Sequence, residues 1–124
     1  MTHREYIGID GHWRRSVVVR MDAEGQVLSS DRIDNDPEEL QQLLAAAGPD
    51  PVVVLEATYG WYWAVDAGRE VGARVQLSHP LGVNAFETQR VKQDHTGARH
   101  LADLLRMNRL PEAWIAPADV RELW

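Results

Sequence analysis

The chain has 124 residues, of which 44% are hydrophobic and 26% are charged, the composition of one compact globular domain. It has no cysteine, no apolar run near the roughly 20 residues that span a bilayer and no signal-peptide pattern, so disulfides and thiolate metal sites are excluded and we expect a cytoplasmic protein without membrane segments. The net charge of −6 argues against a general nucleic-acid-binding protein, although an acidic metal site in a nuclease would itself add negative charge.

Three β-rich segments open the chain, and a turn signal at 23–25 separates the second from the third. The predicted strands cover 6–10, 16–21 and 27–33. Strands joined by such short connections predict an antiparallel meander.

The hydrophobic period then changes to that of a helix. Apolar residues follow the spacing i, i+3, i+4 and i+7 at Leu40, Leu43, Leu44 and Ala47. Asp36 and Glu39 stand ahead of this face in a capping-box arrangement, with Pro37 at the first helical position. Gly48 and Pro49 end the predicted helix.

The remaining segments alternate between strands and helices. Residues 52–55 are a continuous apolar run, typical of a strand that is buried on both faces of a parallel sheet. We also expect a helix over 59–71, a strand over 73–77, partly helical structure over 84–93, a helix over 98–107 and irregular structure over 110–124. The order β-β-β-α-β-α-β-α predicts an α/β, RNase H-like fold. Its mixed five-stranded sheet has a three-strand antiparallel meander followed by alternating helices and parallel strands.

Three acidic residues stand at the ends of these elements. Asp10 ends the first strand, Glu56 directly follows the apolar run, and Asp94 precedes the last helix. Each has an ordinary alternative, since acids are common at strand ends and Asp is a favoured helix N-cap. Taken together in this order, they predict a catalytic site in which Asp10, Glu56 and Asp94 bind Mg²⁺ or Mn²⁺ through carboxylate oxygens.

Several blocks of the sequence resemble the DEDD-type insertion-sequence transposases, the group that includes the Piv-type DNA invertases. The blocks are Gly8-Ile9-Asp10, residues 55–63, Val91-Lys92-Gln93-Asp94 and residues 101–106. The similarity extends from Tyr6 to about Pro117.

This resemblance implies a RuvC-like N-terminal domain of the RNase H-like fold over 1–117, which uses a four-acid metal site for phosphodiester strand transfer on DNA. It implies that the tail, 118–124, leads to a separate C-terminal domain that supplies a nucleophilic serine. It also implies that a structured guide RNA is a partner in some members. We also expect a homo-oligomer.

One position departs from the family pattern Lys-x-Asp-x-x-Asp-Ala. The pattern is matched at Lys92, Asp94 and Ala98. Gly97 stands where the second acid belongs, so we expect weakened metal binding and little or no activity of the isolated domain. Asp103 is six helical residues further on, about 600° of rotation, and faces away. His100 is one turn from Gly97 and reaches the same face, although a surface histidine is the simpler interpretation.

Basic and aromatic residues add two weaker hypotheses. Arg90, Lys92 and Arg99 are predicted to contact nucleic acid, because basic residues gather in this part of the chain. The aromatic cluster consists of Tyr59, Trp61, Tyr62 and Trp63. Stacking on nucleic acid is one interpretation of this cluster, and helix packing with a subunit contact is the favoured one.

Two other functions compete with metal-dependent strand transfer. A non-catalytic nucleic-acid-binding or oligomerisation module of the same fold would also fit, and Gly97 favours it. A fragment of an actin-like ATPase opens with a similar Gly-Ile-Asp strand, but it would need a second phosphate-binding loop and a much longer chain.

Overall fold

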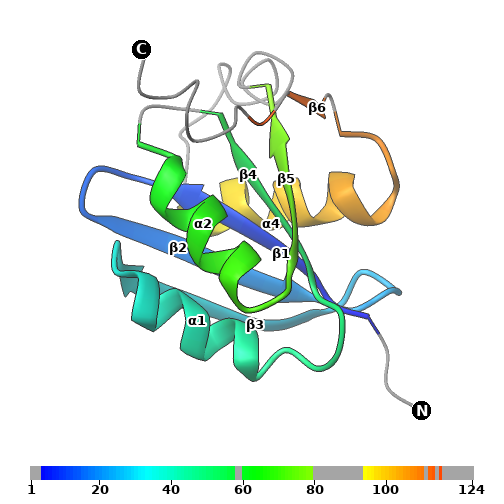
Figure 1. Cartoon of the computed structure of the whole chain (residues 1–124). Coiled ribbons are helices and arrows are strands. Elements are labelled where there is room, and N and C mark those ends of the chain that lie inside the picture. The colour runs from blue at the N-terminus through cyan, green and yellow to red at the C-terminus, as the bar shows by residue number, and fades with distance from the viewer. Residues whose placement is uncertain (1–3, 58–59, 80–93, 111, 114, 116–124) are drawn as a thin grey trace.

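The structure is a computed structural model that describes residues 4–57, 60–79, 94–110, 112–113 and 115. Its strands and helices follow one another along the chain as labelled in Figure 1. The elements are β1 (Tyr6–Gly11), β2 (Arg15–Met21), β3 (Val27–Asp34), α1 (Pro37–Ala45), β4 (Val52–Glu56), α2 (Tyr62–Glu70), β5 (Arg74–Ser78), α4 (Asp94–Arg106) and β6 (Glu112–Ala113).

The strands form one mixed sheet in the order β3-β2-β1-β4-β5-β6. β1 lies in the middle, where it pairs antiparallel with β2 and parallel with β4, and β5 continues the parallel part. The predicted five-stranded α/β sheet is thereby confirmed. β6 adds a strand of two residues at the β5 edge, within a segment that was predicted to be irregular.

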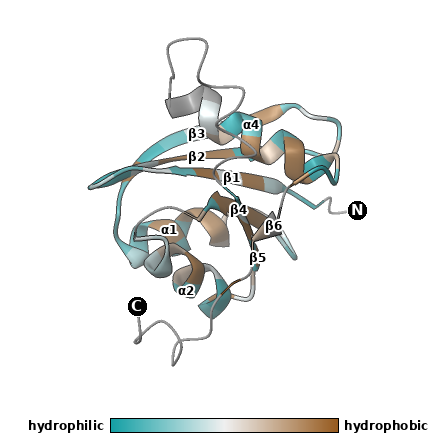
Figure 2. Ribbon diagram, turned by 90° about the horizontal axis from the view of Figure 1, so that it is seen from above, coloured by the Kyte–Doolittle hydropathy of each residue, from teal (hydrophilic) through white to brown (hydrophobic). Residues whose placement is uncertain are grey.

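Helices cover both faces of the sheet, as Figure 2 shows, with α1 and α2 on one side and α4 on the other. Alternate strand residues therefore enter two different cores. The core between the sheet and the helices α1 and α2 contains Ile7, Ile9, Val53 and Leu55 from the strands and Leu40 and Val65 from the helices. The core on the other face contains Val17, Val19, Val52 and Val54 from the strands and Ala98, Leu101 and Leu105 from α4. The apolar run 52–55 is buried on both faces, as predicted.

The helix ends differ from the sequence expectations in three places. Asp36 is the N-cap of α1, but its side chain makes no capping hydrogen bond, so the predicted capping box does not form. α2 begins at Tyr62 because Gly60, with φ of +82°, lies outside the helical region of backbone angles. α4 begins at Asp94 and not at Ala98. Residues 84–93, predicted to be partly helical, lie outside the described residues.

An ion pair on the α1 side ties the sheet to the end of that helix. The Arg20 guanidinium donates to both carboxylate oxygens of Glu5, at 2.7 and 2.9 Å, and to the Ala46 carbonyl at 3.2 Å. Both side chains of the pair are largely buried. The hydrogen bond that Arg20 donates to Glu5 raises the pKa of Arg20 above its ordinary value, so the guanidinium stays charged at all accessible pH.

We expect Glu5→Gln to lower the free energy of unfolding by about 1–3 kcal/mol, because the Arg20 cation then loses its charged acceptor. Urea denaturation of the two proteins measures the difference. Glu24→Gln, in an exposed turn, is the matched control and should change stability by less than about 0.5 kcal/mol. Equal effects of the two substitutions would contradict a stabilising role for the pair.

Candidate metal centre

The first two predicted acids lie side by side at one end of the sheet. β1 and β4 are parallel, and their register pairs Ile9 with Leu55, so Asp10 and Glu56 are the next residues on the two strands. Because side chains alternate along a strand, Asp10 shares a face with Gly8, and Glu56 shares the same face with Val54. This is the face that α4 covers.

Asp10 is the more enclosed of the two acids. Asp10 is only 6% exposed, although it is the next-to-last residue of β1 and close to the strand end. The imidazole Nε2 of His12 lies 3.4 Å from its Oδ2, from the turn that follows β1. Desolvating a carboxylate is costly without a cationic partner, so this position is suited to binding a positive charge.

Glu56 is partly buried and is held by the backbone of β5. It stands opposite Ser78 in the parallel register of β4 and β5. The next amide, that of Ala57, donates to the Ser78 carbonyl at 2.9 Å and continues the pairing beyond the strand end. The backbone that carries Glu56 is therefore fixed, while its side chain stays partly open to solvent.

The packing of α4 determines where Asp94 lies along the sheet. Leu101 and Leu105 pack at the start of β4, whereas Ala98 packs one turn earlier on Gly8 of β1. α4 therefore runs antiparallel to β1, and its first residue, Asp94, lies toward the strand end that carries Asp10. The side chain of Asp94 lies outside the described residues.

Gly8 makes this approach possible. A Cβ atom on Gly8 would lie 2.0 Å from the Ala98 carbonyl oxygen and 2.8 Å from the Ala102 nitrogen. The backbone of α4 thus rests directly on the backbone of β1, two residues before Asp10. The positive end of the α4 dipole consequently points toward the acidic end of the sheet.

The other predicted site residues are spread differently. Arg90 and Lys92 lie outside the described residues, and Arg99 is exposed on α4. Gly97 is buried in α4 and His100 is partly buried. Asp103 pairs with Arg106, whose Nε and Nη2 lie 3.1 and 2.5 Å from its Oδ1, so Asp103 is engaged away from the strand ends. Among the described side chains, no group of three or more His, Asp or Glu residues is close enough to hold a metal ion.

The aromatic cluster is mainly a packing feature. Trp61 is buried in the core beneath α2, and its ring centroid lies 4.4 Å from that of Tyr62. Tyr62 and Trp63 are partly buried against the same core, while Tyr59 lies outside the described residues. The helix-packing part of the favoured interpretation is therefore confirmed for Trp61, and the subunit contact stays a prediction.

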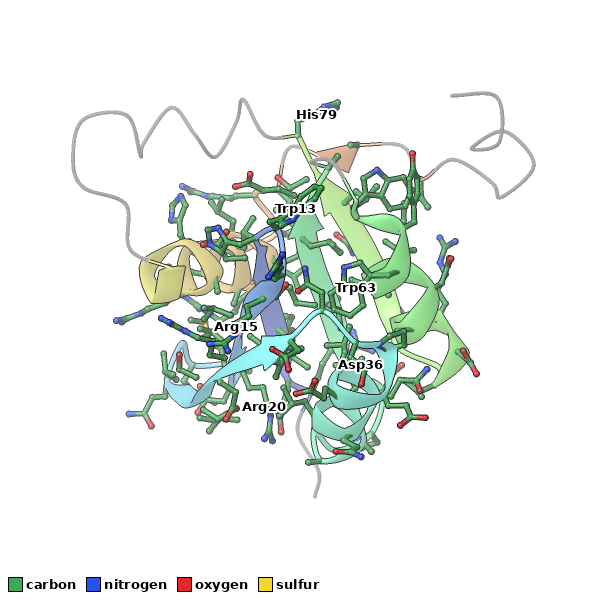
Figure 3. All side chains as sticks on the ribbon, turned by 90° about the vertical axis from the view of Figure 1, so that its left-hand side faces the viewer. Trp13, Arg15, Arg20, Asp36, Trp63 and His79 are labelled. Carbon is green, nitrogen blue, oxygen red and sulfur yellow. The ribbon has the colours of Figure 1, made fainter. Side chains whose placement is uncertain are left out.

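Sequence reasoning missed Trp13, which is 77% exposed on the turn between β1 and β2. Together with Trp61 and Trp63 it lines a pocket of about 430 Å³ beside the acidic strand ends. Figure 3 shows Trp13 and Trp63 on the same side of the molecule. The signal available in the sequence was a single tryptophan within the polar segment Gly11-His12-Trp13-Arg14-Arg15. A large apolar side chain in such a segment is not explained by core packing.

None of the helices in the described part of the chain is both long and apolar enough to cross a membrane.

The sequence matches a family model for transposases, DEDD_Tnp_IS110, over residues 7–124. A search of curated proteins finds no match. Among solved structures, the fold is similar to T. thermophilus RuvC in complex with a Holliday junction substrate, with a TM-score of 0.53 and 13% identity. That match covers 86% of this chain and 98% of the RuvC chain.

A second similar structure is the large terminase nuclease from the thermophilic phage G20c. Its TM-score is 0.52 and its sequence identity is 18%, and the match covers 86% of this chain. This chain spans only 56% of the terminase nuclease chain. At these identities the two likenesses support the fold alone, an RNase H-like fold as predicted.

Proposed function

This chain belongs to the DEDD-type transposases of the IS110 family, and we propose that its RuvC-like domain binds divalent metal ions for phosphodiester strand transfer on DNA. The observation that carries the proposal is the register of β1 and β4. It sets two carboxylates, Asp10 and Glu56, next to each other at the sheet end that the first turn of α4 approaches.

The donor set fits Mg²⁺ or Mn²⁺, because both ions prefer hard oxygen ligands. Asp10 and Glu56 would hold the metal from the sheet, and Asp94 would hold it from the helix. When bound, such ions would supply Lewis acidity to the reacting phosphate. The protein orients the reacting phosphate, which the positive amino end of α4 also attracts.

DNA is the proposed partner. Arg99 is exposed on α4 close to the helix start, and with Arg90 and Lys92 we propose that it contacts phosphates flanking the reacting one. The guide RNA, the serine-bearing domain, the oligomeric state and the cytoplasmic location remain predictions.

Mn²⁺ binding tests the site directly. In ¹⁵N-labelled protein, substoichiometric Mn²⁺ should broaden the amide signals of Asp10, Glu56 and Asp94 and leave the edge strand β3 sharp. Broadening spread evenly over the exposed acids of β3 and α1 would refute a centre at the strand ends. A plasmid-nicking assay with Mn²⁺, using Asp10→Ala as the inactive reference, then tests the chemistry.

The second candidate function is a non-catalytic nucleic-acid-binding or oligomerisation module of the same fold. Gly97 favours it, because a residue without a side chain stands at the fourth acidic position. This alternative would be supported over strand transfer if the chain bound DNA with an affinity that does not depend on Mn²⁺ and did not nick the plasmid.

We expect Gly97→Asp to tighten Mn²⁺ binding by about tenfold, because a fourth carboxylate one turn from Asp94 would join the same charge cluster. Isothermal titration measures the change. Gly97→Asn is the matched control, since it adds the same volume and the same gain in helix propensity without the charge. Equal affinities of the Asp and Asn variants would mean that the position does not face the metal.

A further inference from the structure

Most of the pocket beside the acidic strand ends lies outside the proposed metal centre, with which it shares Glu56. We infer that it receives one unstacked nucleobase of the DNA strand whose phosphate lies at the metal centre. The inference rests on the proposed function. It identifies a second part of the DNA substrate, a nucleobase, that this domain would bind beside the metal centre.

The pocket is built from elements that are distant in sequence. Its walls come from the end of β1, the turn that carries Trp13, the ends of β3 and β4, and the start of α2. Its volume of about 430 Å³ lies in the range of small-ligand sites, and its indole surfaces come from Trp13, Trp61 and Trp63. Large flat aromatic groups are the protein surfaces on which nucleobases stack.

The turn that carries Trp13 is held in place by side-chain hydrogen bonds. The Asn35 amide donates to the carbonyls of His12 and Trp13, at 2.7 and 3.2 Å, and accepts from the Ser16 hydroxyl at 2.7 Å. The His12 amide donates to the Arg15 carbonyl at 2.9 Å and closes the turn. An exposed tryptophan is thus presented on a fixed support, which reduces the entropy lost when a ligand binds.

The pocket and the candidate metal centre share residues. Glu56 ends β4 beside Asp10 and also lines the pocket, and His12 lines the pocket while its imidazole contacts Asp10. A nucleotide bound with its phosphate at the strand ends would therefore have the pocket within reach of its base. The carboxylate in the wall disfavours a phosphate inside the pocket, whereas a neutral planar base avoids that repulsion.

The occupant must be a base that is out of the helical stack, because only an unstacked base exposes its flat face to the indole surfaces of the pocket. Proteins that act on strand ends and junctions meet such bases, and removing a base from a stack is least costly where pairing is already interrupted. We assign the base to DNA, since the shared carboxylate belongs to the proposed strand-transfer site.

The test uses the ¹⁵N-labelled 124-residue chain and three metal-free probes: a thymidine decamer, a decamer of abasic deoxyribose phosphates and a uridine decamer. We expect the thymidine decamer to shift the indole N–H signals of Trp13 and Trp63, and Trp13→Ala to weaken its binding by about tenfold. Trp13 is exposed, so its truncation should leave the fold intact. Leu28→Ala, which also removes an exposed apolar side chain, is the control on β3 and should bind normally.

Unshifted indole signals, or equal binding of the thymidine and abasic decamers, would overturn the inference. Tighter binding of the uridine decamer would overturn its assignment to DNA. Mn²⁺ binding is measured separately on wild type and Asp10→Asn. A chain that captures the base but binds no Mn²⁺ would overturn the proposed function alone, and the reverse result would overturn the pocket assignment alone.

Discussion

Gly8→Ala is expected to destabilise the domain by at least about 3 kcal/mol, a large fraction of the 5–15 kcal/mol that stabilises an ordinary domain. The added methyl group would lie 2.0 Å from the Ala98 carbonyl oxygen, and neither neighbour is a flexible side chain. Relief requires α4 to move away from β1, which opens the core that contains Val17, Val19 and Ala98.

Gly11→Ala is the matched control for this experiment, because Gly11 ends the same strand. Its added Cβ would meet only the Ser16 hydroxyl, at an ordinary distance of 3.7 Å. Urea denaturation should place the Gly11 variant near wild type and the Gly8 variant well below it. Similar stabilities of the two variants would show that the close approach of α4 is not a constraint.

The Gly8 substitution also separates the sheet part of the site from its helix part. Displacing α4 moves Asp94 relative to Asp10 and Glu56, so Mn²⁺ affinity should fall even where the protein remains folded at low temperature. Unchanged affinity in a folded Gly8 variant would mean that Asp94 takes no part in metal binding.

Asp10→Asn is expected to reduce Mn²⁺ affinity on the order of 100-fold or more, since loss of outer-shell partners alone costs 10–100-fold. The amide keeps the shape of the side chain but removes its charge. In metal-free buffer, the same change relieves the repulsion between two adjacent carboxylates, so stability should stay equal or rise. Isothermal titration and thermal denaturation measure the two effects.

Asp34→Asn provides the control for charge alone. Asp34 is exposed at the end of β3, where its carboxylate lies 3.3 Å from the Arg15 guanidinium. Asp34→Asn changes the net charge by the same amount as Asp10→Asn. It should leave Mn²⁺ affinity within about twofold of wild type, because exposed charges are screened by salt. Equal losses in the two variants would indicate diffuse attraction of the ion and would exclude a defined centre.

Local patterns in the sequence were sufficient for most of the fold. The apolar run 52–55 and the segment around Val17–Val19 are rich in β-branched residues, which predicts strands. The order of strands and helices along the chain then predicts the topology. The predictions for Asp10 and Glu56 follow from the same patterns, because parallel neighbours bring their strand ends together. Their positions depend only on where two strands stop.

The features that sequence reasoning missed depend on contacts between distant segments. β6 exists only because β5 offers an edge to residues 112–113. α4 begins earlier than its apolar periodicity, since its first turn contributes no leucine to the core. The pocket combines the turn at Trp13 with the start of α2, and no local pattern joins them.

The central place of β1 also has a kinetic consequence. One edge of β1 pairs with β2, the next strand in the sequence. Its other edge pairs with β4, and one of its faces is covered by α4, both of which come much later in the chain. The meander can therefore form early, whereas the contacts that surround Asp10 close long loops and form late. During synthesis, the acidic strand ends would be assembled only after α4 has left the ribosome. A nascent chain would thus assemble the candidate metal centre as one of the last steps of folding.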